Sequence, residues 1–235
     1  MRKKRPIKSD LAWSTVDKIV VRGKDLPDEI LGHLNLGDMA FLMLVGRTPN
    51  PKESKLFNAV AVTLVEHGIT PSAIATRMTY LGAPESPQAA VAAGLLGLGS
   101  VFVGSTEGVA KMLMENADVE KMKRVPGLGH PLHKQGDPRT RRLFEIARET
   151  GFYGKYCKRI EAIGKQKNLV VNATGAIGAL ACELGIDWRA VRGIGVMARA
   201  IGLVGHILEE AKEPMALELW ERAEEEASEH NRPKK

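Results

Sequence analysis

The chain has 235 residues, of which 44% are hydrophobic, 26% are charged and 5% are aromatic. This composition is typical of a globular domain with a full core, and it excludes a disordered or collagen-like chain. There are 34 Lys and Arg against 28 Asp and Glu, but eight of the basic residues lie in tails at residues 1–8 and 231–235. Without those eight, the body carries 26 basic against 28 acidic residues, so the charge disfavours a nucleic-acid partner.

The predicted elements are almost all helices. Proline in a first turn, side-chain capping residues and apolar residues at a 3.6-residue spacing indicate where they begin and which faces they bury. A first short helix is expected at Leu26–Leu31. In chain order, the predicted helices that follow are 37–47, 51–67, 71–79, a helix from Ser86 onward, 106–116, 138–150, 153–164, 170–184, 188–211 and 214–230.

Only one segment favours a strand. Lys18–Arg22 reads KIVVR and predicts a short edge piece, and no longer stretch alternates apolar and polar residues. The sequence therefore predicts an all-α fold class. Glycine recurs inside the predicted helices, where it costs about 1 kcal/mol relative to alanine, so it indicates helices whose backbones approach closely.

Cysteine content and apolar runs narrow the setting of the protein. Cys157 and Cys182 form neither a disulfide framework nor a metal-ligand spacing, so we expect a cytoplasmic location and no metal site. No apolar segment follows the basic N-terminus before Asp10, so no signal peptide is expected. The longest apolar run, Ala89–Gly104, has about 16 residues against the roughly 20 that a bilayer requires. It predicts a buried core helix, and we expect no membrane partner.

The segment richest in side chains suited to chemistry is Val125–Arg142. It contains a glycine-rich turn at Val125–Gly129, followed by His130 and then by Arg139. Backbone N–H groups in such a turn can face a ligand, and an imidazole beside a guanidinium can bind and polarise a carboxylate or a carbonyl. A surface loop with solvated charges explains the same residues, so both interpretations stay open.

Four polar residues elsewhere have alternative explanations. His67 lies at a predicted helix end, where a histidine also suits the helix dipole. Arg199 lies inside an apolar helix, so it must pair with an acid or contact a ligand carboxylate. His206, in the same helix, predicts a core or interface histidine, and Glu107 predicts a helix cap.

Several segments, in order along the chain, resemble motifs of the citrate synthase family. Val125–Arg139 resembles the motif in which a Gly-His pair is followed nine residues later by the arginine of Asp-Pro-Arg. Glu66–Ser72 resembles the family's first histidine segment, and Ala198–Glu210 resembles its A-R-x-x-G-W-x-A-H-x-L-E-E helix. The resemblance covers about residues 25–215 and is greatest to the short members called citryl-CoA lyases.

This resemblance implies an all-α fold with a large domain at about 10–103 and 188–230 and a small domain at about 104–187. It implies a homodimer whose ligands are a CoA thioester and a keto-dicarboxylate, with no tightly bound cofactor. His67 and His130 would contact the keto acid or the citryl hydroxyl, and Arg139 and Arg199 would bind carboxylates. The residues expected near CoA are Val125, Pro126, Gly127, Leu128 and Gly129.

Two positions depart from the family pattern. Phe102 stands where the family carries the histidine that stabilises a thioester enolate, and Asn172 stands where it carries the aspartate that takes the acetyl-CoA α-proton. Phenylalanine cannot donate to an oxyanion, which costs about 3–4 kcal/mol where such a donor was used. Asparagine cannot accept the proton. Cleavage and condensation share one transition state, so the two changes affect both directions.

Three functions stay open on these residues. The first, which the sequence favours, is a carbon–carbon lyase or condensing enzyme acting on citryl-CoA, with His130 as the base and Asn172 as a catalytic donor to the enolate oxygen. The second is a catalytically impaired protein that binds CoA thioesters or dicarboxylates. The third is an enzyme that generates its enolate by decarboxylating a malonyl-type thioester, which requires no base at Asn172.

Overall fold

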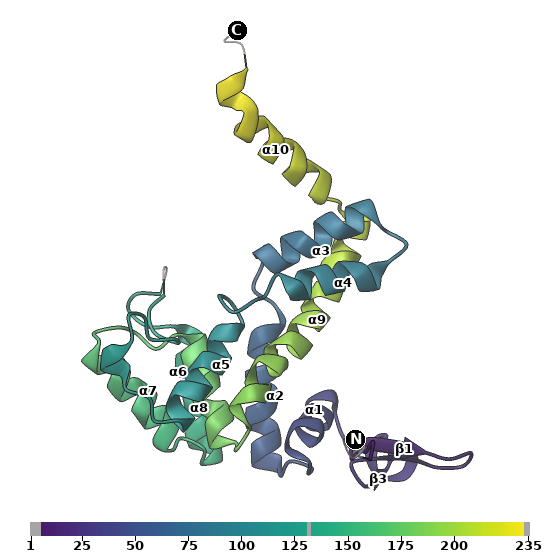
Figure 1. Ribbon diagram of the computed structural model, residues 1–235, viewed down its shortest axis with the longest axis vertical. Helices are drawn as coiled ribbons and strands as arrows, with labels where there is room; N and C mark the ends of the chain where they lie inside the picture. The colour runs from purple at the N-terminus through teal and green to yellow at the C-terminus, as the bar shows by residue number, and fades with distance from the viewer. Residues whose placement is uncertain (1–5, 131–132, 233–235) are drawn as a thin grey trace, which may run out of the picture.

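The computed structural model describes residues 6–130 and 133–232, and most of these residues lie in helices (Figure 1). This confirms the predicted all-α fold class. The α-helices of the described ranges are α1 (Leu36–Val45), α2 (Pro51–Val65), α3 (Pro71–Gly82), α4 (Pro87–Leu96), α5 (Gly104–Met114), α6 (Pro138–Thr150), α7 (Lys155–Gln166), α8 (Ala173–Glu183), α9 (Trp188–Lys212) and α10 (Ala216–Ser228). Short helical turns lie at η1 (Leu26–Ile30), η2 (Val119–Lys121) and η3 (Glu229–Asn231).

Local capping chemistry explains where the helices begin. Proline is the first residue of α2, α3, α4 and α6, where its missing N–H has no intrahelical partner to lose. Asn50 caps α2 and exchanges hydrogen bonds with Glu53 in a capping box. Thr70 caps α3 and Asp137 caps α6 through their side chains. These starts match the predicted ones.

The strand prediction was incomplete. Ile19–Val21 is the central strand β2 of a small antiparallel sheet, between β1 (Ala12–Ser14) and β3 (Lys24–Asp25). Arg22 and Gly23, with φ of 50° and 79°, form the left-handed two-residue turn that joins β2 to β3. Strands of two or three residues show no periodicity, so only their pairing reveals them.

The Ala89–Gly104 run does not form one buried helix as predicted. Helix α4 ends at Leu96, and turns containing Gly97 and Gly99 lead to α5. Of the α4 residues, only Ala90 and Gly94 are buried, while Val91, Ala93 and Leu95 are partly buried and the rest are exposed. Apolar composition alone predicts a core helix, whereas α3 and α9 pack against α4 and bury only part of its surface.

Several other boundaries shift by two or three residues. Helices α7, α8 and α10 begin later than predicted, because Gly154, Asn172 and Met215 are their N-cap residues. Glu107 does not cap α5, since the N-cap position is Val103. Glu107 lies in the first turn and forms an ion pair with Arg192 of α9, at 2.6 Å.

Helix α9 connects the two ends of the molecule. In Figure 1 it runs between α2 and the α3–α4 pair, and it contacts α2, α3, α4 and α5. On the other side, α5, α6 and α7 pack around α8, whose residues are almost all buried. The N-terminal sheet and α10 project from opposite ends of the chain's fold.

By length and composition, α9 is long and apolar enough to cross a bilayer, and it is the one such helix among the described residues. It packs against α2, α3, α4, α5 and α8, so its apolar residues lie at the centre of the fold. The main hydrophobic core contains Phe41, Phe57, Ile177, Leu180 and Ile194, which come from α1, α2, α8 and α9.

Candidate active site

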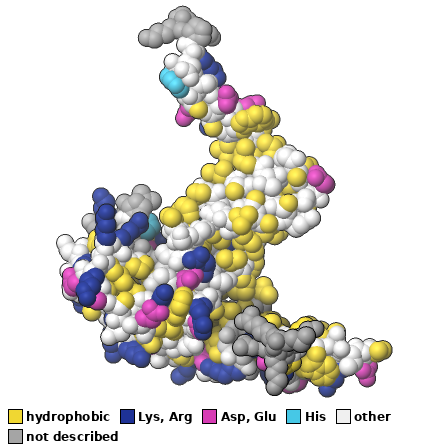
Figure 2. Space-filling view, viewed as in Figure 1, with side chains coloured by type: hydrophobic (Ala, Val, Ile, Leu, Met, Phe, Trp, Pro, Cys, Tyr) yellow, Lys and Arg dark blue, Asp and Glu magenta, His cyan; other side chains and the backbone are white. Residues whose placement is uncertain are grey.

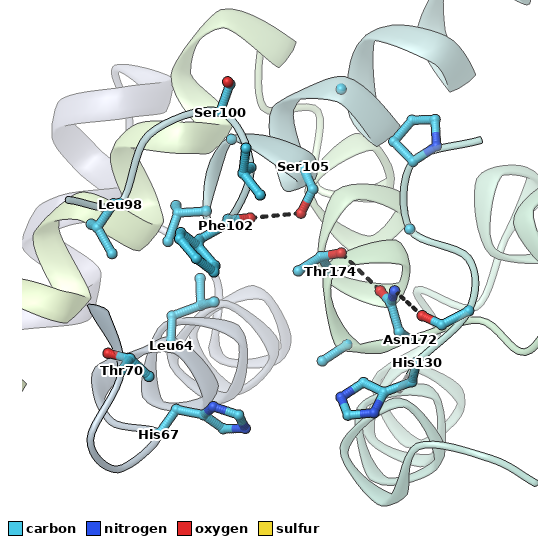
Figure 3. A pocket seen from close by; sticks show the side chains of 18 of the residues that line it. Leu64, His67, Thr70, Leu98, Ser100, Phe102, Ser105, His130, Asn172 and Thr174 are labelled. Carbon is cyan, nitrogen blue, oxygen red and sulfur yellow. Dashed lines mark hydrogen bonds between the residues drawn. The ribbon is translucent and has the colours of Figure 1, made fainter. Parts of the chain in front are cut away.

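The described residues enclose a cavity of about 710 Å³ where several helix N-termini meet (Figure 3). The first turns of α3, α5 and α8 line it, together with the loop that precedes His130. Unpaired N–H groups at helix N-termini carry partial positive charge, so the cavity favours an anionic ligand. The predicted site residues that line it are His67, His130, Arg139, Asn172, Arg199 and the whole of Val125–Gly129.

His67 lies in the loop between α2 and α3, and its ring is directed across the cavity toward His130 (Figure 3). Burial lowers the pKa of His67, and the cations of Arg139 and Arg199 lower it further against the opposing charges of Asp137 and Glu66. Both arginines therefore act on the same imidazole. A neutral imidazole at neutral pH can accept a proton.

His130 is held by the backbone that follows it. Its Nδ1 accepts a hydrogen bond from the His133 N–H at 3.0 Å, which in a neutral ring puts the proton on Nε2. Burial, and next the neighbouring His133, lower the pKa of His130 and so favour the neutral ring. Nη2 of Arg139 lies 3.5 Å from Nε2, so two donors are directed to the same region.

Asp137 orients Arg139. Nε and Nη2 of Arg139 donate to the two Asp137 oxygens at 3.0 and 2.9 Å. Asp137 also accepts from the backbone N–H groups of Arg139 and of Ala173, the first residue of α8. Burial raises the pKa of Asp137, but these hydrogen bonds outweigh it and lower the pKa overall. One buried carboxylate thus joins the N-termini of α6 and α8.

Arg199 is 7% exposed and has an unsatisfied donor. Its Nε donates to the Leu64 carbonyl at 3.2 Å, whereas its buried Nη1 has no hydrogen-bond partner in the described ranges. The structural ion pair that could explain a buried arginine is not found among the described residues. An orphaned guanidinium N–H at a cavity wall is suited to a ligand carboxylate.

Asn172 ties α8 to the glycine-rich loop. Its Oδ1 accepts from the Gly175 N–H at 3.1 Å and from the Thr174 hydroxyl at 2.8 Å, and its Nδ2 donates to the Gly129 carbonyl at 2.7 Å. These hydrogen bonds use the Asn172 amide to hold α8 against the loop, which leaves it less suited to donate to an enolate oxygen. The Gly129 N–H donates to the Val170 carbonyl. The expectation that this N–H faces a ligand is therefore wrong.

The glycine-rich loop contacts α8 backbone to backbone. Gly127 has φ of 78°, and a Cβ on it would lie 2.6 Å from the Gly175 Cα. A larger residue at either position would separate the loop from the start of α8. This close approach brings Val125–Gly129 and Asn172 to one wall of the cavity.

Phe102 is 50% exposed, and its ring lies at the cavity beside Leu64 (Figure 3). The hydroxyls of Thr70, Ser105 and Thr174 also line the cavity, and the motifs did not single them out as site residues. Each lies at or just inside a helix N-terminus. Their position beside a capping signal is the only sequence feature that could have identified them.

The described part of the cavity wall contains no aspartate or glutamate. Its ionisable side chains are histidine and arginine, so its electrostatic character is basic throughout. No group of three or more His, Cys, Asp or Glu side chains suited to a metal ion occurs among the described residues. A proton acceptor within this wall must therefore be an imidazole.

Comparison with known proteins gives consistent matches. Residues 15–220 match the family model described as the C-terminal domain of citrate synthase. A solved citryl-CoA lyase from Hydrogenobacter thermophilus superposes with a TM-score of 0.81 at 37% identity, covering 88% of this chain and 87% of that one. Citrate synthase 2 of Bacillus subtilis is 28% identical over 71% of this chain and 50% of its own length.

A probable ATP-citrate synthase of Dictyostelium discoideum is 25% identical over 92% of this chain, but over only 40% of that protein. The chain therefore spans half or less of the length of these two curated relatives.

Proposed function

The chain belongs to the citrate synthase family, as its motifs predicted, and on this premise we propose that it is a carbon–carbon lyase that cleaves citryl-CoA to acetyl-CoA and oxaloacetate. The observation that carries the proposal is the buried, unpartnered Nη1 of Arg199 beside a cavity that His67, His130 and Arg139 also line. Such a basic cavity matches a ligand with several carboxylates. A solved structure that the chain matches over 87% of its length is a citryl-CoA lyase.

In this proposal, Arg199 and Arg139 bind the two carboxylates of the citryl group. The CoA portion lies along Val125–Gly129, whose backbone forms one cavity wall. The CoA thioester is the substrate, and the residues described here require no tightly bound cofactor. We further propose that the protein is a cytoplasmic homodimer.

The hydrogen bonds favour His67 rather than His130 as the base that starts cleavage. Neutral His67 removes the proton from the citryl hydroxyl, and the C–O bond becomes the carbonyl of oxaloacetate as the adjacent C–C bond breaks. The bonding pair passes to the thioester as an enolate, which water protonates on carbon. Nε2 of His130 and Nη2 of Arg139 both donate to the citryl oxygen that loses its proton and becomes the carbonyl oxygen of oxaloacetate.

A second candidate function is binding without turnover. Phe102 places a ring, not a hydrogen-bond donor, at the cavity, and no described acidic side chain lines it. Both observations fit a homologue that retains the carboxylate and CoA contacts but lacks catalysis. An enzyme that makes its enolate by decarboxylation is also compatible, because that route requires no carboxylate base.

One panel of measurements tests these alternatives. Purified protein is incubated with citryl-CoA, with malonyl-CoA plus oxaloacetate, and with acetyl-CoA plus oxaloacetate, and the products are identified by mass spectrometry. Calorimetric titrations with citrate and with CoA are run in parallel. Release of oxaloacetate and acetyl-CoA from citryl-CoA supports the lyase, binding without products supports the second candidate, and absence of both contradicts the proposed site.

A further inference from the structure

A buried polar cluster behind the cavity has no role in the chemistry described so far. Arg77 of α3 is fully buried, and its Nη1 donates to Glu210 of α9 at 2.7 Å while its Nη2 also pairs with Glu209. Its Nε donates to Nδ1 of His206, which is 7% exposed, at 3.1 Å. Every one of these groups lies on α3 or α9, behind the wall that carries His67.

The arginine determines the tautomer of His206. A guanidinium has donors only, so Nδ1 of His206 must accept, and the proton of the neutral ring resides on Nε2. That Nε2 lies 3.1 Å from Oε1 of Glu66 and therefore donates to it. The buried cluster thus ends in one directed hydrogen bond to the carboxylate that precedes His67.

The same carboxylate shapes the His67 loop. Oε1 of Glu66 accepts from the backbone N–H groups of His67 at 2.8 Å and of Gly68 at 2.7 Å. Burial raises the pKa of Glu66, but the His67 N–H and the His206 side chain outweigh it and lower the pKa, so the acceptor stays ionised. One oxygen therefore accepts from α9 and from the two peptide groups that direct the His67 side chain.

Helix α9 holds the end of α2 over consecutive turns. Arg199 and His206 are seven residues apart, so they share a face of α9, and they bond to the Leu64 carbonyl and to Glu66 respectively. Between them, a Cβ on Gly202 would overlap the Val65 carbonyl and lie 2.7 Å from Oε2 of Glu66. The spacing between the Arg199 guanidinium and His67 is thus determined by one rigid element.

From this geometry we propose that His206 and Glu66 are positioning residues, which act through the backbone of His67 to hold its imidazole at the cavity opposite His130. The inference rests on the proposed function of His67. It gives a role to His206 and to the buried Arg77, neither of which is among the residues that line the cavity.

The test uses Glu66, which is 42% exposed in its side chain and tolerates substitution better than the buried Arg77. Glu66→Gln keeps an oxygen acceptor and loses the charge, whereas Glu66→Ala loses both. Comparing these two variants separates the effect of the hydrogen-bond acceptor on the position of His67 from the effect of the Glu66 charge. Glu226→Ala, an exposed substitution on α10, is the matched control.

The first readout is the pKa of the His67 ring by NMR titration of the free protein, which needs no ligand and no activity. We expect a higher pKa of His67 in Glu66→Ala than in Glu66→Gln, because a displaced ring becomes more hydrated and moves away from Arg139 and Arg199, and both changes raise its pKa. The second readout is citrate affinity, with an expected loss of about tenfold in Glu66→Ala and recovery of most of it in Glu66→Gln. Melting temperature is measured for all variants.

Equal His67 pKa values and equal citrate affinities in the two Glu66 variants would overturn the proposal. So would a loss of melting temperature in Glu66→Ala without any change at His67, since that is the signature of a merely structural contact. If the unsubstituted protein binds no citrate, the proposed function fails on its own, and the His67 titration still decides whether Glu66 positions the ring.

Discussion

Arg199 is the predicted site residue whose surroundings best fit a ligand contact. It is buried, yet its Nη1 lacks a partner among the described residues. Removing it should therefore relieve a desolvated donor while deleting a ligand contact. For Arg199→Ala we expect citrate binding to weaken by about 2 kcal/mol, roughly 30-fold, with a much smaller change in the free energy of unfolding.

Calorimetry with citrate and urea unfolding measure both effects. The exposed Arg222→Ala on α10 serves as the control. A large loss of stability with unchanged citrate affinity would show instead that Arg199 is part of the core.

The lowered pKa of His67 makes a prediction about pH dependence. A base must be deprotonated, so activity falls as pH drops through the His67 pKa, and that limb should lie below the usual value of 6.5 because burial and then Arg139 and Arg199 lower it. Arg139→Gln removes one of these cations and should move the limb to higher pH.

The measurement is kcat/KM for citryl-CoA cleavage from pH 5 to 8, with Arg141→Gln, an exposed neighbour on α6, as the control. If Arg139→Gln leaves the acid limb where it was, His67 is not the titrating base.

The absence of an acid from the described cavity wall leads to a gain-of-function prediction. Thr174 lines the cavity, whereas Asn172 uses its side chain to cap α8 and hold Gly129. Phe102→His with Thr174→Asp should raise deuterium exchange into the α-position of acetyl-CoA, because it adds a donor and a carboxylate base to one step.

The partner variant Phe102→His with Asn172→Asp should be less active and less stable, since a carboxylate oxygen there would face the Gly129 carbonyl. Greater exchange in that variant would return the catalytic position to residue 172. No increase in either variant would mean that the cavity does not hold the thioester.

At the level of elements, Asp137 joins α6 and α8, and Asp187 at the start of α9 has the same local arrangement and so serves as its comparison. Both Asp137 and Asp187 cap a helix and pair with the arginine two residues later, but the Asp187 side chain is 47% exposed while that of Asp137 is fully buried. Asp137→Asn should cost about 2–3 kcal/mol of unfolding free energy, and Asp187→Asn should cost much less because its pair is exposed to solvent.

The pH dependence of this difference has a defined sign. The folded-state pKa of Asp137 is lowered, so its stabilisation is present above its ordinary value of 3.8 and is lost as pH falls through the folded-state value. Urea unfolding at pH 7 and at progressively lower pH should show the gap between wild type and Asp137→Asn narrowing. A gap that stays constant would contradict the role given to the carboxylate charge.

Over the whole molecule, one exposed apolar surface remains unexplained by a monomer. Ile201, Val204 and Leu208 recur at spacings of three and four on α9 and are about half exposed, and Leu96 on α4 is 85% exposed. Figure 2 shows hydrophobic side chains gathered over α3, α4 and α9. Contiguous apolar surface of this kind marks an interface, so we predict a homodimer through these helices.

Light scattering at micromolar concentration should give the mass of two chains. Leu208→Glu should shift it toward one chain, whereas Leu36→Glu, which is equally exposed on α1 at the other end of the molecule, should not. A single-chain mass for the unsubstituted protein would contradict the prediction.

The sequence by itself determined the helical class, the family and the proline-led starts of α2, α3, α4 and α6, because capping and 3.6-residue periodicity are local properties. It also suggested His67, His130, Arg139 and Arg199 as candidates from motifs within short segments, and all four line one cavity in the structure. It could not show that α4 stays mostly exposed, or that residues 12–25 pair as a sheet. Nor could it show that the Asn172 amide donates to the Gly129 carbonyl and is therefore not free for a ligand. Those facts depend on which segments meet across long separations in the chain.

The tertiary structure alone decided the chemistry of the wall. The surroundings of Arg199, whose Nη1 has no partner among the described residues, and the link from Arg77 through His206 to Glu66 each require two or more segments in contact. The same arginine in an apolar helix could have been an ion pair or a ligand contact. The packing supports the proposed ligand contact, because no described acid pairs with the Arg199 guanidinium and the cost of a buried charge depends on which partners lie within hydrogen-bond distance.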